Sequence, residues 1–444
     1  MRISTLLFYI LLILLPTQAG KHFWPKWSFV HGIRIDYLSP TIFLTDLVLL
    51  FLLFFWFLEK PFSRKTLPRK KIFYFFLFLV FLLTSSLLAN RPILSFYKVA
   101  KLFEFYLFGL YVSKNVATKK HFTLVVFSLV LGTFWSSFLA WAQFLAQSSL
   151  SLLFLSTYPL LYFSLQLLGE RTFAIATPGV AKASWDSRLV LRPYATFPHP
   201  NVLAGFAVVV FALVISNFRL LTEKTRRSSV IYYLSSIIIA SATLLITFSR
   251  SAWVVWLLVV SCWMLEKKNI APSLFKKSRA FGLIVLLAAL IAYYALPVVF
   301  QHFAILKTDD FLSVSRRIEL SKTAFRMVRS SPVFGVGLGN FIPKLSDFSR
   351  SREAIYWLQP VHNIFFLVAA ETGLVGLGIF LWFLVFTFKR LLKPLLTINY
   401  SLLTTLASVL ALGLFDHYFF TLQQTQFLFS LVLGLCWLER KRTL

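Results

Sequence analysis

Acidic residues are scarce in this chain, which has 16 Asp and Glu against 45 Lys and Arg among 444 residues. Charged residues of both signs make up 14% of it, whereas a soluble domain carries about a quarter. Apolar residues take their place, at 58% of the chain with 51 Phe. They fall in runs of about 18 or more, the length of a membrane-spanning helix. This composition excludes a soluble protein and predicts an all-α polytopic membrane protein.

Cysteine is almost absent too, since Cys262 and Cys436 are the two that the chain has. Both fall near predicted cytoplasmic ends of spans, so neither a disulfide nor a cysteine metal site is expected. The cytoplasmic loops are short and contain no phosphate-binding glycine-rich loop, and no soluble domain of ordinary size is attached. Any chemistry is therefore predicted to occur on the outer face.

We predict about twelve transmembrane helices, with both the N- and C-termini in the cytoplasm. The predicted spans are 4–16, 41–58, 72–89, 97–113, 122–145, 200–217, 230–248, 251–265, 280–300, 362–387, 394–415 and 424–438. The predicted cytoplasmic loops are rich in Lys and Arg, whereas the short outer loops near 90, 250 and 416 hold only Arg91 and Arg250. This asymmetry follows the positive-inside rule, so the net charge of +29 reflects membrane orientation rather than nucleic-acid binding.

The N-terminal stretch has two interpretations. Residues 1–20 have a basic residue, a short apolar core and a small-residue end, which fits either a cleaved signal peptide or the first span. Residue 21 is outside in both cases. The whole chain, 1–444, is then a single integral membrane domain with two large extracytoplasmic loops, 146–199 and 301–361.

The second large loop contains a predicted amphipathic helix. Ile318, Phe325 and Val328 can share one side of this helix. Its basic residues include Lys322, Arg326 and Arg329, and their simplest role is contact with lipid headgroups. The "SPVFGVGLGNF" segment follows, in which Pro332 ends the helix. Its glycines, Gly335, Gly337 and Gly339, permit tight turns. We predict a plain turn there rather than a phosphate-binding loop.

A histidine stands where the "VHNIFFLVAAETGLVGLGIFL" span begins. Helical spacing places His362 above a seam formed by Ala369, Gly373 and Gly376, where another helix can approach. Glu371 is turned about 180° from His362 and lies roughly 13 Å deeper. We expect it to pair with another span, and span four, with Lys98, Lys101 and Glu104, is one such region.

Several arginines are predicted to lie at the same membrane face as His362. Arg250 sits in the tight "TFSRSAW" junction, Arg192 precedes Pro200 and Asn201 at the start of span six, and Arg316 and Arg317 belong to the second loop. Guanidinium groups match phosphate oxygens, so this set suits a phosphate or diphosphate. Asp309 and Asp310 form no metal-coordinating cluster with nearby His or Glu, so no metal and no cofactor is expected. His362 could then take a proton from an acceptor hydroxyl.

The pattern resembles a family. The chain has His362-Asn363, then nine residues, then Gly373-x-x-Gly376, and this pattern is similar to the H-N-x9-G-x-x-G element of bacterial O-antigen ligases and polymerases. Further elements of that superfamily are resembled by three other segments, "TFPHPNVLAGF", "TFSRSAW" and "SRRIELSKTAFRMVRSSPVFGVGLGNF". The order agrees over about 190–380, which we take as the O-antigen ligase-like core, although Ser321 stands where the family often has Trp.

The resemblance implies a C-type glycosyltransferase fold and a location in the bacterial cytoplasmic (inner) membrane. The family moves a glycan from undecaprenyl diphosphate, without metal or nucleotide, to an acceptor at the outer face, as in lipopolysaccharide biosynthesis. It implies His362 as general base and Arg250 and Arg317 on the diphosphate. To these we add Arg192 and Arg316 as further predicted diphosphate-binding residues. The predicted supporting residues are Asn363, Asn201, Gly373, Gly376 and Glu371.

The choice within the superfamily stays open at the sequence level. A ligase, a polymerase and a protein O-oligosaccharyltransferase all fit, with a glycan, lipid or protein acceptor. A transporter of the same lipid-linked glycan would need charged residues along a path through the bilayer, whereas interior charge is sparse, with Glu104 and Glu371 as the main cases. A purely structural membrane protein would not need arginines and a histidine at one face.

Overall fold

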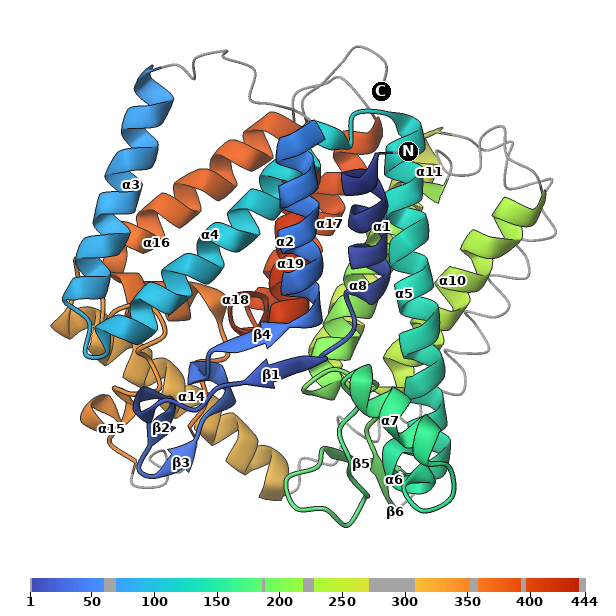
Figure 1. The fold of residues 1–444 in the computed structure, drawn as a ribbon, viewed down its shortest axis with the longest axis horizontal. Coiled ribbons are helices and arrows are strands. Elements are labelled where there is room, and N and C mark those ends of the chain that lie inside the picture. Colours follow the sequence, from blue (N-terminus) through green and yellow to red (C-terminus); the bar gives the residue numbers. More distant parts are fainter. Residues whose placement is uncertain are drawn as a thin grey trace.

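The computed structural model describes residues 2–59, 69–185, 188–218, 227–270, 308–351, 358–392 and 397–438. Within these ranges the chain is mostly helical (Figure 1). The longer helices are α1 (Ile3–Leu14), α2 (Leu44–Glu59), α3 (Arg69–Leu87), α4 (Pro92–Asn115), α5 (Lys119–Ala146), α8 (Pro200–Ser216), α10 (Arg227–Ile246), α11 (Arg250–Ile270), α14 (Thr308–Ser330), α16 (Ile364–Leu391), α17 (Thr397–Gly413) and α19 (Gln423–Cys436). The short helices are α6 (Leu150–Phe154), α7 (Pro159–Leu167), α15 (Leu345–Phe348) and α18 (Tyr418–Thr421).

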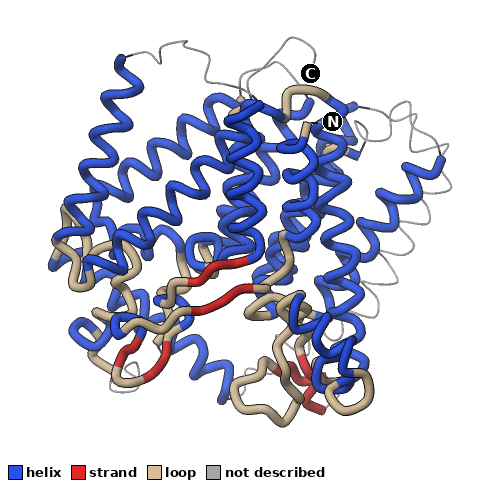
Figure 2. Tube along the Cα trace, viewed as in Figure 1, coloured by secondary structure: helices blue, strands red, loops and turns tan. Residues whose placement is uncertain are grey.

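Three two-stranded antiparallel sheets complete the described part. They pair β1 (Gly20–His22) with β4 (Thr41–Phe43), β2 (Phe29–Val30) with β3 (Ile33–Arg34), and β5 (Lys182–Trp185) with β6 (Arg188–Leu191). Figure 2 shows these strands in the lower half of the molecule, with β1 and β4 nearest its middle, β2 and β3 at lower left and β5 and β6 at lower right. Helices α6, α7, α14 and α15 lie in that same half, and α1 and α5 begin in the opposite one (Figure 1). The two loops predicted outside the membrane therefore gather at one end.

The predicted spans agree with the helices in position. Eleven of the twelve coincide with helices of the structure, and the ninth, 280–300, lies outside the described residues. By length and apolar composition, two helices in the described ranges, α5 and α16, could each cross a membrane, and the other apolar helices are shorter. The mostly helical class is confirmed, and the number of crossings stays a prediction.

Helix starts follow the local sequence. Pro92 and Pro200 occupy the first turns of α4 and α8, where the missing N–H of proline costs no hydrogen bond. Thr118 caps α5 by accepting the backbone N–H of His121. At its other end α5 stops at Gln147, which has a left-handed backbone with φ 54°.

Helix α8 forms the centre of the bundle. Almost every residue from Pro200 to Ile215 is buried, as expected for a helix that is apolar on all sides. It packs against α5, α10, α11 and α17. The segment that leads into it, with Arg192 and His199, is therefore held against the core.

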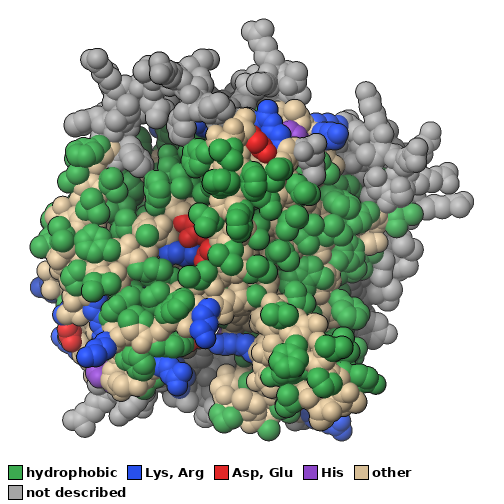
Figure 3. Space-filling model, viewed as in Figure 1, with side chains coloured by type: hydrophobic (Ala, Val, Ile, Leu, Met, Phe, Trp, Pro, Cys, Tyr) green, Lys and Arg blue, Asp and Glu red, His purple; other side chains and the backbone are tan. Residues whose placement is uncertain are grey.

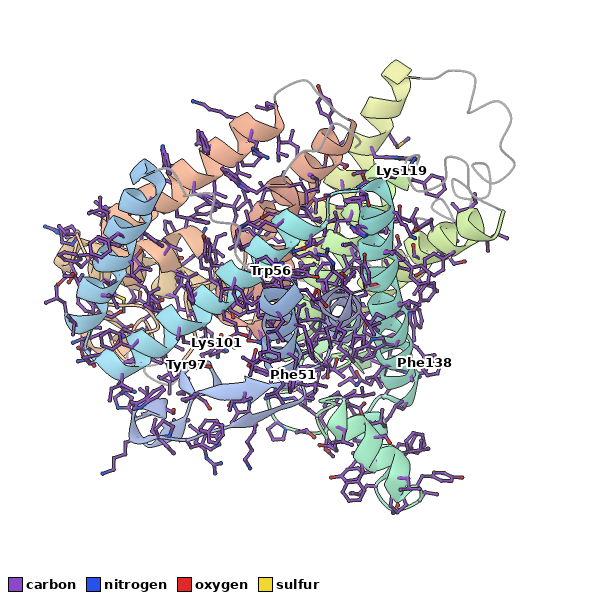
Figure 4. All side chains as sticks on the ribbon, turned by 45° about the horizontal axis from the view of Figure 1, so that its top comes forward. Phe51, Trp56, Tyr97, Lys101, Lys119 and Phe138 are labelled. Carbon is purple, nitrogen blue, oxygen red and sulfur yellow. The ribbon has the colours of Figure 1, made fainter. Side chains whose placement is uncertain are left out.

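Large apolar side chains cover much of the outer surface (Figure 3). On α2, Leu50 and Phe51 are 63% and 56% exposed, and Phe138 of α5 is 75% exposed; Figure 4 labels Phe51 and Phe138. Such continuous apolar cover fits helices that meet lipid rather than water. A polar cluster interrupts it, in which Lys101 of α4 (Figure 4) bonds to Asp46 at 3.0 Å and Glu104 at 2.7 Å.

Candidate functional site

His362 lies immediately before α16, at the end of the molecule that carries the strands. Its neighbour Asn363 is the N-cap, and the Asn363 Oδ1 accepts the backbone N–H groups of Phe365 and Phe366 at 2.9 and 3.0 Å. The Asn363 Nδ2 also donates to the carbonyl of Leu414 at 3.1 Å, just past the end of α17. The asparagine thus starts the helix and fixes His362 beside α17.

The predicted seam for a second helix at Gly373 is wrong. Gly373 has φ 69° and ψ −175°, a break inside α16, and the residue in contact with it is Val333 in the loop that follows α14, whose carbonyl oxygen would clash with any Cβ there. The N–H of Leu374 donates to Pro332 O at 2.7 Å across the break. At Gly376 a Cβ would meet the side chain of Thr372 in the same helix. Gly373 therefore serves a helix break rather than helix–helix packing.

Glu371 stabilises the glycine-rich loop. Its Oε1 accepts the N–H of Phe341 at 3.3 Å, and its backbone oxygen accepts the N–H of Gly337 at 2.9 Å. Gly335, Gly337 and Gly339 all have positive φ, which fits the predicted plain turn. The charge of Lys98 on α4 acts on the Glu371 carboxyl group, and the Lys98 Nζ itself donates to the carbonyl of Tyr37 at 2.8 Å. The predicted pairing of Glu371 with span four stays a prediction.

A groove of about 650 Å³ opens in front of His362. One wall is α14, and the other is formed by the start of α16 and the end of α17. Its lining residues are Val314, Arg317, Ile318, Ser321, Lys322, Phe325, Arg326, His362, Asn363, Phe366, Leu414 and Phe415. The groove therefore combines basic and apolar side chains around the histidine.

The apolar side chains of α14 face two sides of the helix. Ile318 and Phe325 are 50% and 70% exposed and line the groove, whereas Leu320, Ala324 and Met327 face the core. Arg326 does not extend towards lipid, because it donates to Glu319 at 3.0 Å and to the carbonyl of Phe348 at 2.8 Å.

Two residues that sequence reasoning missed lie beside His362. The ring of His417 meets that of His362 edge to face, with centroids 5.3 Å apart. His362, Asp416 and His417 each offer a ligand atom within 4.8 Å of one another, so this group is also able to hold a metal ion. Asp416 and His417 follow the end of α17, and the tie from Asn363 to Leu414 brings that end to His362.

Arg192 is joined to this group through Asn201. Its guanidinium donates to Asn201 Oδ1 at 2.6 Å and to the carbonyl of Thr247 at 2.7 Å. Asn201 Nδ2 in turn donates to Asp416 Oδ2 at 3.5 Å. Asn201, at the start of α8, therefore links an arginine to the acid beside His362.

The predicted arginines come together, with one exception. Burial, and after it repulsion from Arg250 and Arg317, lowers the pKa of Arg192 to about 10, with Tyr194 opposing. Arg250 and Arg317 therefore lie near enough to Arg192 for their charges to act on it. Arg316 is exposed on α14 and does not line the groove.

The histidines of the site are neutral near pH 7. Burial lowers the pKa of His362 below its usual 6.5, and Arg317 lowers it further while Asp416 opposes the change. Burial lowers the pKa of His199 and of His417 to about 3. The carboxyl group of Asp416 has a lowered pKa despite its burial, because His417, His362 and Arg317 lie near it. The site therefore presents neutral imidazoles, one carboxylate and several guanidinium groups.

Nδ1 of His362 is buried and has no hydrogen-bond partner within the described ranges. The side chains of Asp309 and Asp310 lie outside the described residues. Both cysteines are free, Cys262 exposed and Cys436 buried.

Comparison with known families gives a match over residues 235–381, to the family described as O-antigen ligase. The matched segment includes Arg250, Arg317, His362, Gly373 and Gly376, whereas Arg192 and Asp416 lie outside it. No curated protein matches the chain significantly. The match supports the O-antigen ligase-like superfamily of membrane proteins and a glycosyltransferase of the ligase or polymerase type.

Proposed function

From the match to the O-antigen ligase family, we propose that this protein transfers a glycan from undecaprenyl diphosphate to an acceptor hydroxyl at the outer face of the bacterial cytoplasmic membrane. The observation that carries the proposal is the groove in which His362 and Arg317 lie together. It is lined by apolar residues as well, which suits a donor that is charged at one end and apolar at the other.

His362 acts as the general base in this proposal. A base must be unprotonated at working pH, and the lowered pKa of His362 meets that condition. When His362 accepts the acceptor proton it becomes an imidazolium. Asp416, whose carboxyl group remains ionised nearby, stabilises that charge, as a carboxylate does for a catalytic histidine.

The arginines bind the diphosphate leaving group. Arg317 reaches the groove, and Arg192 and Arg250 share its electrostatic environment. As the glycosidic bond breaks, negative charge grows on the diphosphate, and positioned guanidinium groups stabilise it. Arg192 is fixed by Thr247 and Asn201, so this positive charge is positioned before the reaction begins.

Donor cleavage tests the proposal. Purified protein in nanodiscs receives labelled undecaprenyl-diphosphate glycan and an envelope acceptor fraction, and release of the lipid diphosphate is followed with the size of the labelled product. We expect His362→Ala to abolish release, and His31→Asn, which changes an exposed histidine with positive φ, to leave it unchanged.

Product size separates the members of the superfamily. A ladder of products identifies a polymerase, and one shifted band a ligase or a protein glycosyltransferase. Donor that binds without being cleaved, in wild type with several acceptors, contradicts the proposal and favours transport.

A further inference from the structure

The helical hairpin formed by α6 and α7 has reversed polarity, with its apolar side chains outside. Leu160 is 83% exposed, Leu167 74% and Phe163 60%. Leu153 of α6 and Tyr158 at the turn are also exposed. In water such a hairpin would bury these side chains and expose its polar ones.

The inside of the same hairpin is polar. Glu170, only 2% exposed, accepts the backbone N–H groups of Leu150 and Ser151 at 2.9 and 2.7 Å, and Gln143 Nε2 donates to it at 2.7 Å. Ser149 and Ser151 are buried beside it. A satisfied polar interior under an apolar exterior is the arrangement expected for a segment surrounded by lipid.

The hairpin continues the apolar surface of a helix that is itself long and apolar enough to span a membrane. On α5, Phe138 and Leu145 are each 75% exposed, and Figure 3 shows apolar side chains over the lower right of the molecule, where Figure 1 places α6 and α7. Helix α6 begins at Leu150, four residues after α5 ends. Four residues reach at most ~14 Å, so the hairpin stays near the end of α5.

The composition of the hairpin also fits the boundary between lipid and water. Residues 147–169 contain no charged side chain. Tyr158 and Tyr162 lie near its turn, and tyrosine favours this boundary because its ring is apolar and its hydroxyl is polar. We infer that the α6–α7 hairpin is an interfacial anchor that inserts its exposed leucines and Phe163 among the lipids of the outer leaflet.

The anchor is joined to the segment that carries Arg192. Gln143 Oε1 accepts the N–H groups of Tyr194 and Ala195 at 3.0 and 2.8 Å. Gln147 Oε1 accepts the N–H of Leu191 at 2.8 Å. A hairpin held in the leaflet therefore fixes the height of Arg192 relative to the lipid surface.

Site-specific fluorescence tests lipid contact. In a Cys262→Ser background, where the remaining native Cys436 is buried, Leu160→Cys, Phe138→Cys and Lys26→Cys each add one exposed cysteine, which is labelled with an environment-sensitive fluorophore in nanodiscs. Phe138 is the lipid-facing control and the exposed Lys26 the aqueous one. The nanodisc lipids are brominated near the headgroup end of their acyl chains, so that bromine quenches a fluorophore that enters the lipid. We expect the fluorescence of the label at position 160 to be quenched to within about twofold of that at position 138, and the label at position 26 to be quenched little.

The remaining outcomes overturn the inference. Iodide quenching at 160 equal to that at 26 means that the hairpin stands in water. Protection from both quenchers means that protein covers it, and the mass of the particle then shows whether a second copy does so. Phe163→Cys is measured in parallel, so that a single poorly folded variant does not decide the result.

Discussion

The imidazole rings of His362 and His417 meet edge to face, with centroids 5.3 Å apart. They come from segments 55 residues apart in sequence, and Asp416 lies within 4.8 Å of both. The hydroxyl of Thr421 holds Nδ1 of His417 at 2.7 Å. His362 therefore has a fixed neighbour on one side and the groove on the other.

The transfer rate should fall on the acid side of neutrality. Burial lowers the pKa of His362 below 6.5, so the base is neutral at pH 7.5 and becomes protonated only in more acidic solution. A pH–rate profile measures this acid limb. Since Asp416 raises the pKa of His362, Asp416→Asn should move the limb to lower pH. Movement to higher pH would contradict the assignment.

The stability of the fold should also decrease with acid. His199 and His417 have a pKa of about 3 when folded and about 6.5 when unfolded. Below pH 6.5 the unfolded chain binds more protons, so the free energy of unfolding falls as pH falls towards 3. At pH 5.5 the loss is roughly 1.4 kcal/mol for each histidine. Thermal unfolding at pH 7.5 and 5.5 measures it, and His417→Gln should show a smaller difference than wild type.

Gly373→Ala should destabilise the protein. Its φ of 69° with ψ of −175° is a backbone conformation that costs other residues about 1–3 kcal/mol, and the added Cβ would also clash with Val333 O. Gly378 in the same helix has nothing within 4 Å of a Cβ, so Gly378→Ala should be neutral or stabilising, by up to about 1 kcal/mol. Equal unfolding temperatures for the two variants would refute the break.

Asn363 has two roles that two substitutions separate. Asn363→Asp keeps an oxygen that can cap α16 and loses the donor to Leu414 O, whereas Asn363→Ala loses both. Loss of an N-cap costs about 1 kcal/mol, so only the alanine variant should lose that stability. Both variants should transfer more slowly, because His362 loses its tie to α17. An aspartate variant with the wild-type transfer rate would show that the tie is unimportant.

The sequence predicted the features that depend on local pattern. The apolar runs gave the positions of the helices, and Pro200 marked the start of α8. The sequence placed Arg192 and Arg250 near the ends of spans and Arg317 in the second outer loop, and their roles stay predictions. Arg316 is adjacent to Arg317 but does not line the groove, because one residue changes the side of a helix by about 100°.

The missed features depend on contacts between distant segments. Asp416 and His417 carry no motif, and contacts between distant segments, among them the bond from Asn363 to Leu414 and the packing of Gly413 against Ile364, bring them to His362. The "ETGLVGLG" stretch has the pattern of an uninterrupted span, and its break at Gly373 arises because the loop at Pro332 and Val333 packs against it. On α14, the sequence pattern does not show that Ile318 and Phe325 line the groove, nor that Leu320 and Met327 pack into the core.

The break at Gly373 divides α16 into two mechanical units. The first nine residues, 364–372, form a helix about 14 Å long. Hydrogen bonds join it to the loop of Val336 and Gly337, and Asn363 joins it to α17. A bilayer of different thickness changes the tilt of a membrane helix, and a break divides such a helix into two segments that need not tilt together. We therefore expect the geometry around His362 to depend less on the surrounding lipid than the longer part of the same helix does.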